Sequence, residues 1–401
     1  MTTPNTPLPV VLAGARGHGR RHLENIRRLQ LLGLARLVGI CELFPLTEEE
    51  LDGFGPVAQS ADFAGLLDST GAALAVISTP IPTHTDLAVD AAERGVHLLL
   101  EKPPAPSYGE FRRMADAVAS AGTACQIGFQ SLGSHAIPAI RELIADHVIG
   151  EVTGVGAAGA WARDEAYYRR APWAGHRRLD GADVVDGVLT NPLAHAVATA
   201  LALAGTTRDE DVAAVHTELF RANAVESDDT SCVRIDTADG RRVTVAATLC
   251  AEQPGEPYVV VHGSKGRITF WYKQDRVRVH HADHGPQEAR YGRTDLLDNL
   301  VEHLAGRAEL LVPPRETGAF MRVVEAIRLA PDPVELPPGA WYTAPGESTG
   351  RRVVHGIDAL VACAADTLGL YSELGADWAV RAPAKRPRPT RNDRPDEVRT
   401  S

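Results

Sequence analysis

Short apolar runs separated by amphipathic stretches dominate the first 130 residues of the chain. Four runs consist mostly of Val, Ile, Leu and Ala, as expected of strands buried on both faces of a parallel sheet: residues 8–14, 35–41, 73–78 and 97–100. Between them apolar residues recur at helical spacing, first at Leu23, Ile26, Leu29 and Leu32. Further elements are expected to be helices over 87–94 and 108–121 and a strand over 124–130. This alternation predicts a Rossmann-type α/β domain over residues 1–130.

Residues 151–280 follow a different pattern, in which extended segments alternate with turn residues. The segments are 151–163, 212–220, 230–236, 241–250, 258–262 and 267–272. Asp239-Gly240 stands between two of them and is typical of a β-hairpin. Neighbouring hairpins predict a second, α+β domain with a mainly antiparallel open sheet, over residues 131–381.

Two amphipathic helices are expected late in the chain, over 315–330 and 353–374. The tail over 382–401 is rich in Pro and Arg and poor in apolar residues, so we expect it to be disordered.

A glycine-rich turn follows the first strand, with the sequence Gly14-Ala15-Arg16-Gly17-His18-Gly19. A strand, such a turn and a helix together suit a pyrophosphate, because glycines allow close approach and the helix N-terminus supplies free N–H groups. Arg16 stands where G-x-G-x-x-G has its middle glycine, so the match is imperfect. Glu42 ends the second strand, where a carboxylate can bind the adenosine ribose of NAD. Arg16 leaves NADP possible, and a solvated strand-end charge is the alternative for Glu42.

Other polar residues come directly after the later strands, at Thr79-Pro80 with His84, and at Glu101-Lys102-Pro103. The carboxyl ends of parallel strands meet at one edge of a sheet, where ligands bind. Lys102 is one of only four lysines in the chain. A desolvated lysine can exchange a proton, which arginine cannot, so Lys102 is a candidate for proton transfer. The alternative is a salt-bridged lysine at a strand end.

These motifs, with Arg20-Arg21-His22 behind the glycine turn and Gly128-Phe129-Gln130 after the last strand, resemble the Gfo/Idh/MocA family, named for glucose–fructose oxidoreductase and inositol dehydrogenase. The resemblance implies an NAD(P)-dependent oxidoreductase acting on a sugar, cyclitol or related polyol, with Lys102 near the nicotinamide and the substrate hydroxyl. It also implies a homo-oligomer, dimer or tetramer, formed through the open sheet. The expected cofactor residues are Gly14, Arg16, Gly17, His18, Gly19, Glu42, Thr79, Pro80, His84, Glu101, Lys102 and Gln130.

The general base is harder to place. The family usually has an Asp followed four residues later by a His that transfers the proton. Asp186 fits the first position, but Thr190 stands at the second, and a hydroxyl cannot replace an imidazole as a base. Three explanations stay open: His195 supplies the base, Lys102 takes the proton with a relay through Asp186, or dehydrogenation has been lost. The catalytic candidates are therefore Lys102, Asp186 and His195.

Asn191-Pro192 predicts an N-cap and first turn of a helix that runs to Ala204. Asn191 and His195 would then share one helix face and could reach one substrate. His195 has apolar neighbours, so a buried core histidine is the alternative.

Trp161, Tyr167, Tyr168 and Trp173 lie in a segment rich in arginine. Aromatic faces suit the C–H faces of a sugar, and the arginines would suit an anionic substrate such as a sugar acid. A loop anchored by its aromatic residues is an equal alternative. The expected substrate contacts are Lys102, Trp161, Tyr168, Trp173, Thr190, Asn191 and His195.

Composition narrows the functional classes further. The net charge of −11 argues against broad nucleic-acid binding, and no apolar run reaches the length of about 18 residues that a membrane span needs. The N-terminus has no signal pattern, and five scattered cysteines show no metal-ligand spacing, so we expect reduced thiols, no metal site and a cytoplasmic location. Two other functions stay open: NAD-using cleavage of a glycoside through transient oxidation, and a catalytically silent protein that senses a sugar or dinucleotide.

Overall fold

Six parallel strands form the first sheet of the computed structural model, which describes residues 6–281, 285–345 and 350–380. Their order across the sheet is β3-β2-β1-β4-β5-β6, the order of a dinucleotide-binding Rossmann sheet. The strands are β1 Leu8–Ala13, β2 Ala35–Cys41, β3 Ala58–Ser60, β4 Leu74–Ile77, β5 His97–Leu100 and β6 Cys125–Ile127. The prediction of a parallel Rossmann-type sheet is confirmed.

Four helices connect these strands: α1 Gly19–Leu31, α2 Phe63–Thr70, α3 His84–Glu93 and α4 Tyr108–Ala121. The buried face of α1 carries Leu23, Ile26 and Leu29, as the apolar spacing predicts. Leu32, expected on the same face, is 60% exposed, because the helix ends at Leu31 and Leu32 lies past its last turn. Residues 58–70, which form β3 and α2, were not predicted as elements.

The second sheet has nine strands in the order β16-β15-β14-β13-β7-β12-β11-β10-β17. They are β7 Val152–Ala160, β10 Val212–Arg221, β11 Thr230–Thr237, β12 Arg242–Thr248, β13 Tyr258–Gly263, β14 Gly266–Trp271, β15 Arg276–His281, β16 Gln287–Arg290 and β17 Val334–Glu335. All neighbouring pairs are antiparallel except β7 with β12 and β10 with β17. The mainly antiparallel sheet is therefore confirmed, and Gly240 (φ +85°) turns the predicted hairpin between β11 and β12.

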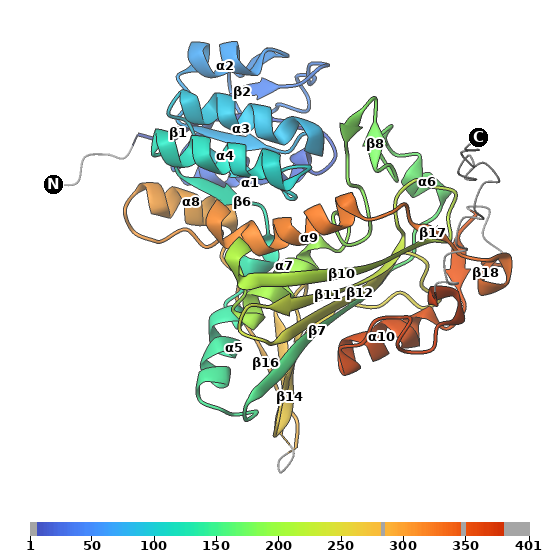
Figure 1. Cartoon of the computed structure of the whole chain (residues 1–401). Helices are drawn as coiled ribbons and strands as arrows, with labels where there is room; N and C mark the ends of the chain where they lie inside the picture. Colours follow the sequence, from blue (N-terminus) through green and yellow to red (C-terminus); the bar gives the residue numbers. More distant parts are fainter. Residues whose placement is uncertain (1–5, 282–284, 346–349, 381–401) are drawn as a thin grey trace, which may run out of the picture.

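Helices cover both faces of the middle of this sheet. A Cβ on Gly156 of β7 would meet the backbone of Ala365, whereas one on Gly159 would meet Leu193, and these two positions point to opposite faces of a strand. Small residues on β7 thus let α10 approach one face and the segment leading into α7 the other (Figure 1). The helices of this half are α5 Ala136–Ala145, α6 Glu165–Tyr168, α7 Ala194–Ala204, α8 Leu296–Leu304, α9 Gly318–Leu329 and α10 Ile357–Thr367.

The helix predicted over 353–374 is shorter than expected. Arg352–Val354 forms strand β19, which pairs with β18 (Trp341–Thr343), and only α10 is helical. A second small ribbon consists of β8 Arg178–Leu179 and β9 Ala182–Asp183. Short 3-10 turns cover Ile81–Thr83, Gln130–Gly133, Asp209–Asp211, Pro314–Thr317, Pro338–Ala340 and Asp377–Ala379.

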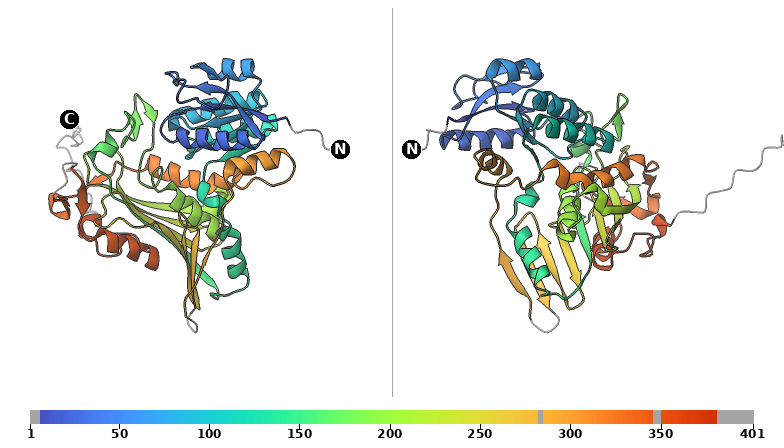
Figure 2. Two further views of the ribbon diagram at one scale, coloured as in Figure 1. Left: turned by 180° about the vertical axis from the view of Figure 1, so that it is seen from behind. Right: turned by 60° about the vertical axis from the view of Figure 1, so that its left-hand side comes forward.

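The late part of the chain returns to the first sheet. The two views of Figure 2 place α8 and α9 between the two sheets, and α8 packs on β5 and β6. The N–H of Ile127 in β6 donates to the carbonyl of Val312 at 2.9 Å. The buried amide of Gln126 donates to Asn299 Oδ1 at 2.6 Å and accepts from the N–H of Val312 at 2.9 Å. Residues 296–312 therefore complete the outer edge of the first sheet.

The predicted domain boundaries at 130 and 381 stay predictions, and the tail over 382–401 lies outside the described residues. Within the described ranges, no helix has both the length and the apolar character that a bilayer span requires. All five cysteines are unpaired.

Candidate functional site

The glycine turn between β1 and α1 packs too tightly for side chains. A Cβ on Gly14 (φ +80°) would lie 2.6 Å from the carbonyl oxygen of Ser78 at the end of β4, and one on Gly19 would lie 1.8 Å from the carbonyl oxygen of Gly14. Gly17 (φ +57°) has open space where a Cβ would stand. No side chain caps the N-terminus of α1 and its first turn has no acidic residue, so its N–H groups are open to an anion. The turn fits a dinucleotide pyrophosphate.

Glu42 reaches back to this turn from the end of β2. Its Oε1 accepts from the N–H groups of Ala15 at 2.6 Å and Arg16 at 3.2 Å. The side chain of Arg16 turns instead to the loop after β2, where it donates to the carbonyl of Pro45 at 3.1 Å and pairs with Glu50 at 3.4 Å. The carboxylate and the arginine thus both stand at the carboxyl end of β2, where an adenosine ribose binds in Rossmann sheets.

Leu43 and Phe44, which follow Glu42, were missed as site residues. They are 81% and 75% exposed, whereas most large apolar side chains of the chain are buried. The signal in the sequence is two apolar residues directly after the strand-end acid. An exposed apolar surface next to a carboxylate can contact an adenine ring while the carboxylate binds the ribose.

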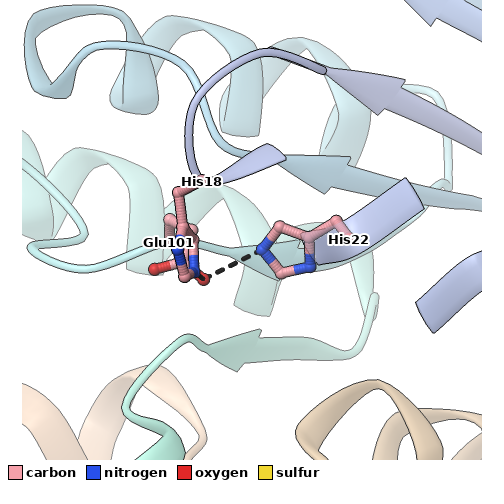
Figure 3. A group of neighbouring side chains, drawn as sticks. All are labelled: His18, His22 and Glu101. Carbon is pink, nitrogen blue, oxygen red and sulfur yellow. Dashed lines mark hydrogen bonds and ion pairs between the residues drawn. The ribbon is translucent and has the colours of Figure 1, made fainter. Parts of the chain in front are cut away.

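Glu101, at the end of β5, is surrounded by hydrogen-bond donors (Figure 3). Its Oε1 lies 3.0 Å from His22 Nε2, 3.3 Å from His18 Nε2 and 2.8 Å from Gln130 Nε2. Burial disfavours the carboxylate, but the bonds from His18 and His22 outweigh it and hold the pKa of Glu101 well below its ordinary value. The bond to Glu101 in turn raises the pKa of His18. The structure therefore places a histidine pair and an amide around one buried anion beside the glycine turn.

The donor atoms of His18, His22 and Glu101 lie within 4.8 Å of one another, a grouping that could hold a divalent ion. The expectation of no metal site rested on cysteine spacing, which cannot reveal a set whose members are 79 residues apart. The same side chains also hydrogen-bond through Glu101 Oε1, and the expectation of no metal site stays a prediction.

His84 holds two loops together. It is buried, and its ring nitrogens lie 2.8 Å from the carbonyl oxygens of Pro103 and Thr79. Burial lowers the pKa of His84. Its contacts fix the loop after β4 against Lys102-Pro103, which a cis peptide bond joins. A direct cofactor contact of His84, like those of Thr79 and Pro80, stays a prediction.

Lys102 meets Asn191 from the other half of the chain. The ammonium Nζ donates to Asn191 Oδ1 at 2.7 Å and to the carbonyl of Asn191 at 3.0 Å. Asn191 Nδ2 donates to Asp186 Oδ1 at 2.6 Å, and Asp186 Oδ2 accepts from Arg170 at 3.3 Å and from the N–H of Gly175 at 2.7 Å. Burial lowers the pKa of Lys102 and raises the pKa of Asp186. Lys102 and Asp186 are therefore linked through an amide rather than in direct contact.

The structure does not place Thr190 in this site. Thr190 is 1% exposed, its hydroxyl donates to the carbonyl of Val185, and it accepts from the N–H of Gly187 at 2.9 Å. The predicted helix start is also wrong: α7 begins at Ala194, because the side chain of Asn191 binds Lys102 and Asp186 and caps no helix. The pair spaced four residues apart at Lys102 is therefore Asn191 with His195.

His195 lies in the first turn of α7 and is half-buried. Its Nδ1 lies 3.2 Å from Ser131 Oγ, which also accepts from the hydroxyl of Thr199 at 2.9 Å. Burial, together with the charge of Lys102, lowers the pKa of His195 to about 3, so the imidazole is neutral at neutral pH. Ser131 and Thr199 were missed, since nothing in the local pattern of either segment relates them to His195.

The aromatic residues of 161–173 stack on arginines. Arg163 lies over Trp161 and Tyr167, with its Cζ 5.0 and 4.9 Å from the ring centroids, and Arg170 lies over Tyr167 and Trp173 at 3.7 and 4.7 Å. Guanidinium groups therefore cover ring faces that the sequence suggested for a sugar. The ring of Tyr168 contacts Tyr167, and its buried hydroxyl has no hydrogen-bond partner within the described residues.

Comparison with known proteins matches both halves. Residues 8–129 match an oxidoreductase family with an NAD-binding Rossmann fold, and residues 137–269 match the GFO/IDH/MocA C-terminal domain. The chain belongs to the GFO/IDH/MocA family. The family inferred from the sequence motifs is thus confirmed. This GFO/IDH/MocA protein combines a parallel Rossmann sheet with a mainly antiparallel sheet.

Among curated proteins, the chain is similar to levoglucosan dehydrogenase of Pseudarthrobacter phenanthrenivorans (24% identity over 58% of this chain) and to inositol 2-dehydrogenase of Streptomyces avermitilis (30% over 28%). The matches cover 64% and 34% of those two proteins, less than two thirds of either. A solved structure with the same fold is the WlbA dehydrogenase from Bordetella pertussis in complex with NADH and UDP-GlcNAcA. It has 22% identity and a TM-score of 0.65, over 80% of this chain and 95% of WlbA.

Proposed function

We propose that this GFO/IDH/MocA protein is an NAD-dependent oxidoreductase that transfers a hydride between the nicotinamide and a sugar, cyclitol or related polyol. One observation carries the proposal. The ammonium of Lys102 lies at the carboxyl edge of the first sheet, on which the glycine turn also lies; Asn191 holds it there, and its charge acts on the neutral imidazole of His195. The dehydrogenase names of the two curated relatives support it.

The residues for the cofactor lie along that edge. The N–H groups behind Gly17 and Gly19 would bind the pyrophosphate, and Glu42 would bind the adenosine ribose next to Phe44. Glu42 favours NAD, because a second negative charge at a 2′-phosphate would repel it. Arg16, at the same strand end, leaves NADP as a second cofactor.

NAD would supply the hydride acceptor; the chain's own residues handle the hydroxyl group. Lys102 donates a hydrogen bond to the substrate oxygen as its proton leaves. His195 accepts that proton at Nε2, provided that its other nitrogen is protonated and donates to Ser131 Oγ. Ser131 Oγ already accepts from Thr199 and has a second lone pair for this bond. In this tautomer Ser131 Oγ accepts from both Thr199 and His195, and Nε2 of His195 is left free to act as a base.

Titration with NADH and NADPH, followed by energy transfer from the tryptophans, tests the cofactor assignment. We expect saturable NADH binding that weakens when Glu42 is changed to Ala and is unchanged when the exposed Glu48 is changed to Ala. Failure to bind either nucleotide would overturn the proposal.

A panel of inositols and sugars, assayed for NADH formation, tests the reaction. Lys102→Met should lower kcat/KM by about 10²- to 10⁴-fold, the range for loss of an acid–base group, with NADH affinity retained. The matched control is Lys265→Met, at an exposed turn position between β13 and β14. Tight NADH binding without turnover of any compound would favour the silent binding protein.

We also propose that the protein acts in the cytoplasm as a homo-oligomer. The unpaired thiols, three of them buried, support the first point. For the second, β14–β16 extend the sheet beyond the strands that α7 and α10 cover, which leaves sheet surface available to a second copy. The molar mass measured by light scattering tests this assembly: a monomeric mass would overturn it.

A further inference from the structure

We propose that the substrate carries an oxyanion, a carboxylate or a phosphate, and that Arg163 binds it. This inference rests on the proposed function, since it names the substrate class of the same site. Its basis is an alternation of rings and guanidinium groups, here called the arginine ladder: Trp161, Arg163, Tyr167, Arg170 and Trp173.

The arginine ladder is continuous with the reacting groups. Its inner arginine, Arg170, pairs with Asp186 at 3.3 Å, and Asp186 binds the amide that holds Lys102. The segment that contains the ladder and α6 follows the end of β7 and lies beside the small ribbon that includes β8 (Figure 1). A sugar whose hydroxyl lies at Lys102 therefore has the ladder on its second-domain side.

The two arginines of the ladder differ in their charge partners. Arg170 is balanced by Asp186, whereas Arg163 forms no ion pair with any carboxylate of the described residues. Its guanidinium donates to the carbonyl of Ala162 at 2.9 Å. The acids next to it in sequence are engaged elsewhere: Asp164 caps α6 by accepting from the N–H of Tyr167 at 2.9 Å, and Glu165 pairs with Arg169 at 3.3 Å.

Arg163 is half-buried and has no carboxylate partner among the described residues, so an anionic ligand would supply the missing counter-charge. Two rings hold Arg163 in place, so little side-chain freedom is lost when it binds. Its planar fork matches the two oxygens of a carboxylate or phosphate in a bidentate contact. A neutral polyol has no negative charge to neutralise the guanidinium of Arg163, so the arrangement favours an anionic sugar.

Affinity measurements on the NADH-loaded protein test this inference. The probes are three matched sets, built on glucose, galactose and mannose, each with the neutral hexose, the hexuronate and the hexose 6-phosphate. Binding is followed by calorimetry and by the fluorescence of the tryptophans, two of which belong to the ladder. We expect at least one anionic probe to bind more tightly than its neutral hexose. Arg163→Gln should remove about 10- to 100-fold of that affinity, the range for a lost hydrogen bond to a charged group, and leave the hexose unaffected.

The matched control is Arg169→Gln, at an exposed position next to Arg170 that stacks on none of the ladder rings. This control should keep the preference for the anion, and both variants should keep the circular dichroism and NADH affinity of the parent protein. A preference for the hexuronate assigns a carboxylate, and a preference for the 6-phosphate assigns a phosphate.

Equal affinity for the neutral and anionic probes, or an equal loss for both in Arg163→Gln, would overturn the inference. Neither result affects the proposed dehydrogenase activity, which NADH binding and turnover test separately. Should NADH fail to bind, the same titrations on the protein alone still test the arginine ladder, because its members all belong to the second half of the chain.

Discussion

The side-chain oxygen of Asn191 lies 2.7 Å from the ammonium nitrogen of Lys102, while the amide nitrogen of the same residue lies 2.6 Å from a carboxylate oxygen of Asp186. Lys102 therefore has a neutral hydrogen-bond partner, and the amide of Asn191 lies between it and the carboxylate of Asp186. A carboxylate in direct contact would favour the ammonium form more strongly than an amide does. Asn191 thus keeps Lys102 bound and oriented without stabilising its charge to the same extent.

Changing Asn191 to Asp should raise the pKa of Lys102, because it puts a negative charge at hydrogen-bond distance from the ammonium. If the protonated lysine is the form that donates to the substrate oxygen, the alkaline limb of kcat/KM moves to higher pH by about one unit or more. The pH profile of NADH formation measures this shift. An alkaline limb that stays in place would show that another group sets it.

Loss of His195 should lower kcat by about 10²-fold or more, as expected when a general base is removed. Ser131→Ala should lower kcat by about 5-fold, the effect of one lost hydrogen bond, because Ser131 acts only through the tautomer of His195. KM should change little in Ser131→Ala, since Ser131 contacts His195 rather than the substrate. Steady-state kinetics separate the two constants. Unchanged turnover in His195→Ala would remove His195 from the reaction.

His195 should also make the folded protein sensitive to acid. Burial lowers its pKa from 6.5 to about 3. Below pH 6.5 this histidine is therefore protonated in the unfolded chain but stays neutral in the folded chain. Stability is therefore full above pH 6.5 and declines toward pH 3, by at most about 1.4 kcal/mol for each pH unit from this residue. Denaturant unfolding of the parent and of His195→Asn, compared at pH 7.0 and 5.5, isolates this contribution. An equal loss in both proteins would contradict it.

Gly19→Ala should abolish NADH binding. Its Cβ would lie 1.8 Å from the carbonyl oxygen of Gly14, so the turn must open and its N–H groups move. Gly109→Ala is the matched control, since its Cβ, at an exposed position of α4, would meet nothing nearer than Ser107 Oγ at 4.0 Å. The control should stabilise the protein by up to about 1 kcal/mol, because alanine favours a helix more than glycine does. Thermal unfolding and NADH titration of both variants test the pair.

Local sequence patterns predicted the first sheet because each of its buried strands is a run of apolar residues bounded by a recognisable turn. They missed the edge of the second sheet: every residue of β16 is exposed, so no apolar signal marks it. The helix predicted over 353–374 failed at its start for the opposite reason. Val353 and Val354 are buried, but they are paired in a strand with Tyr342 and Trp341.

The sequence could not single out the proposed proton-transfer residues, because two residue pairs meet the four-residue spacing. One pair is Asp186 with Thr190, and the other is Asn191 with His195. Which residue contacts Lys102 depends on the conformation of the turn that ends at Leu193, and in the structure this residue is Asn191. Thr190 is buried and hydrogen-bonded to Val185 and Gly187, so the choice between an enzyme and a silent binding protein now rests on His195, which the His195→Ala variant tests. The contact between Lys102 and Asn191 joins positions 89 residues apart, a distance over which no local pattern carries information.

The return of residues 296–312 to β6 affects how the chain can be synthesised and divided. On the ribosome, the first sheet emerges long before Val312. The backbone N–H of Ile127 and the amide of Gln126 therefore lack these hydrogen-bond partners until most of the second sheet has been synthesised. In a fragment cut near residue 130, β6 would be an unpaired edge strand and the amide of Gln126 would lose its hydrogen-bond partners. Unpaired edge strands promote aggregation. Joining residues 296–312 to such a fragment through a flexible linker would restore those partners.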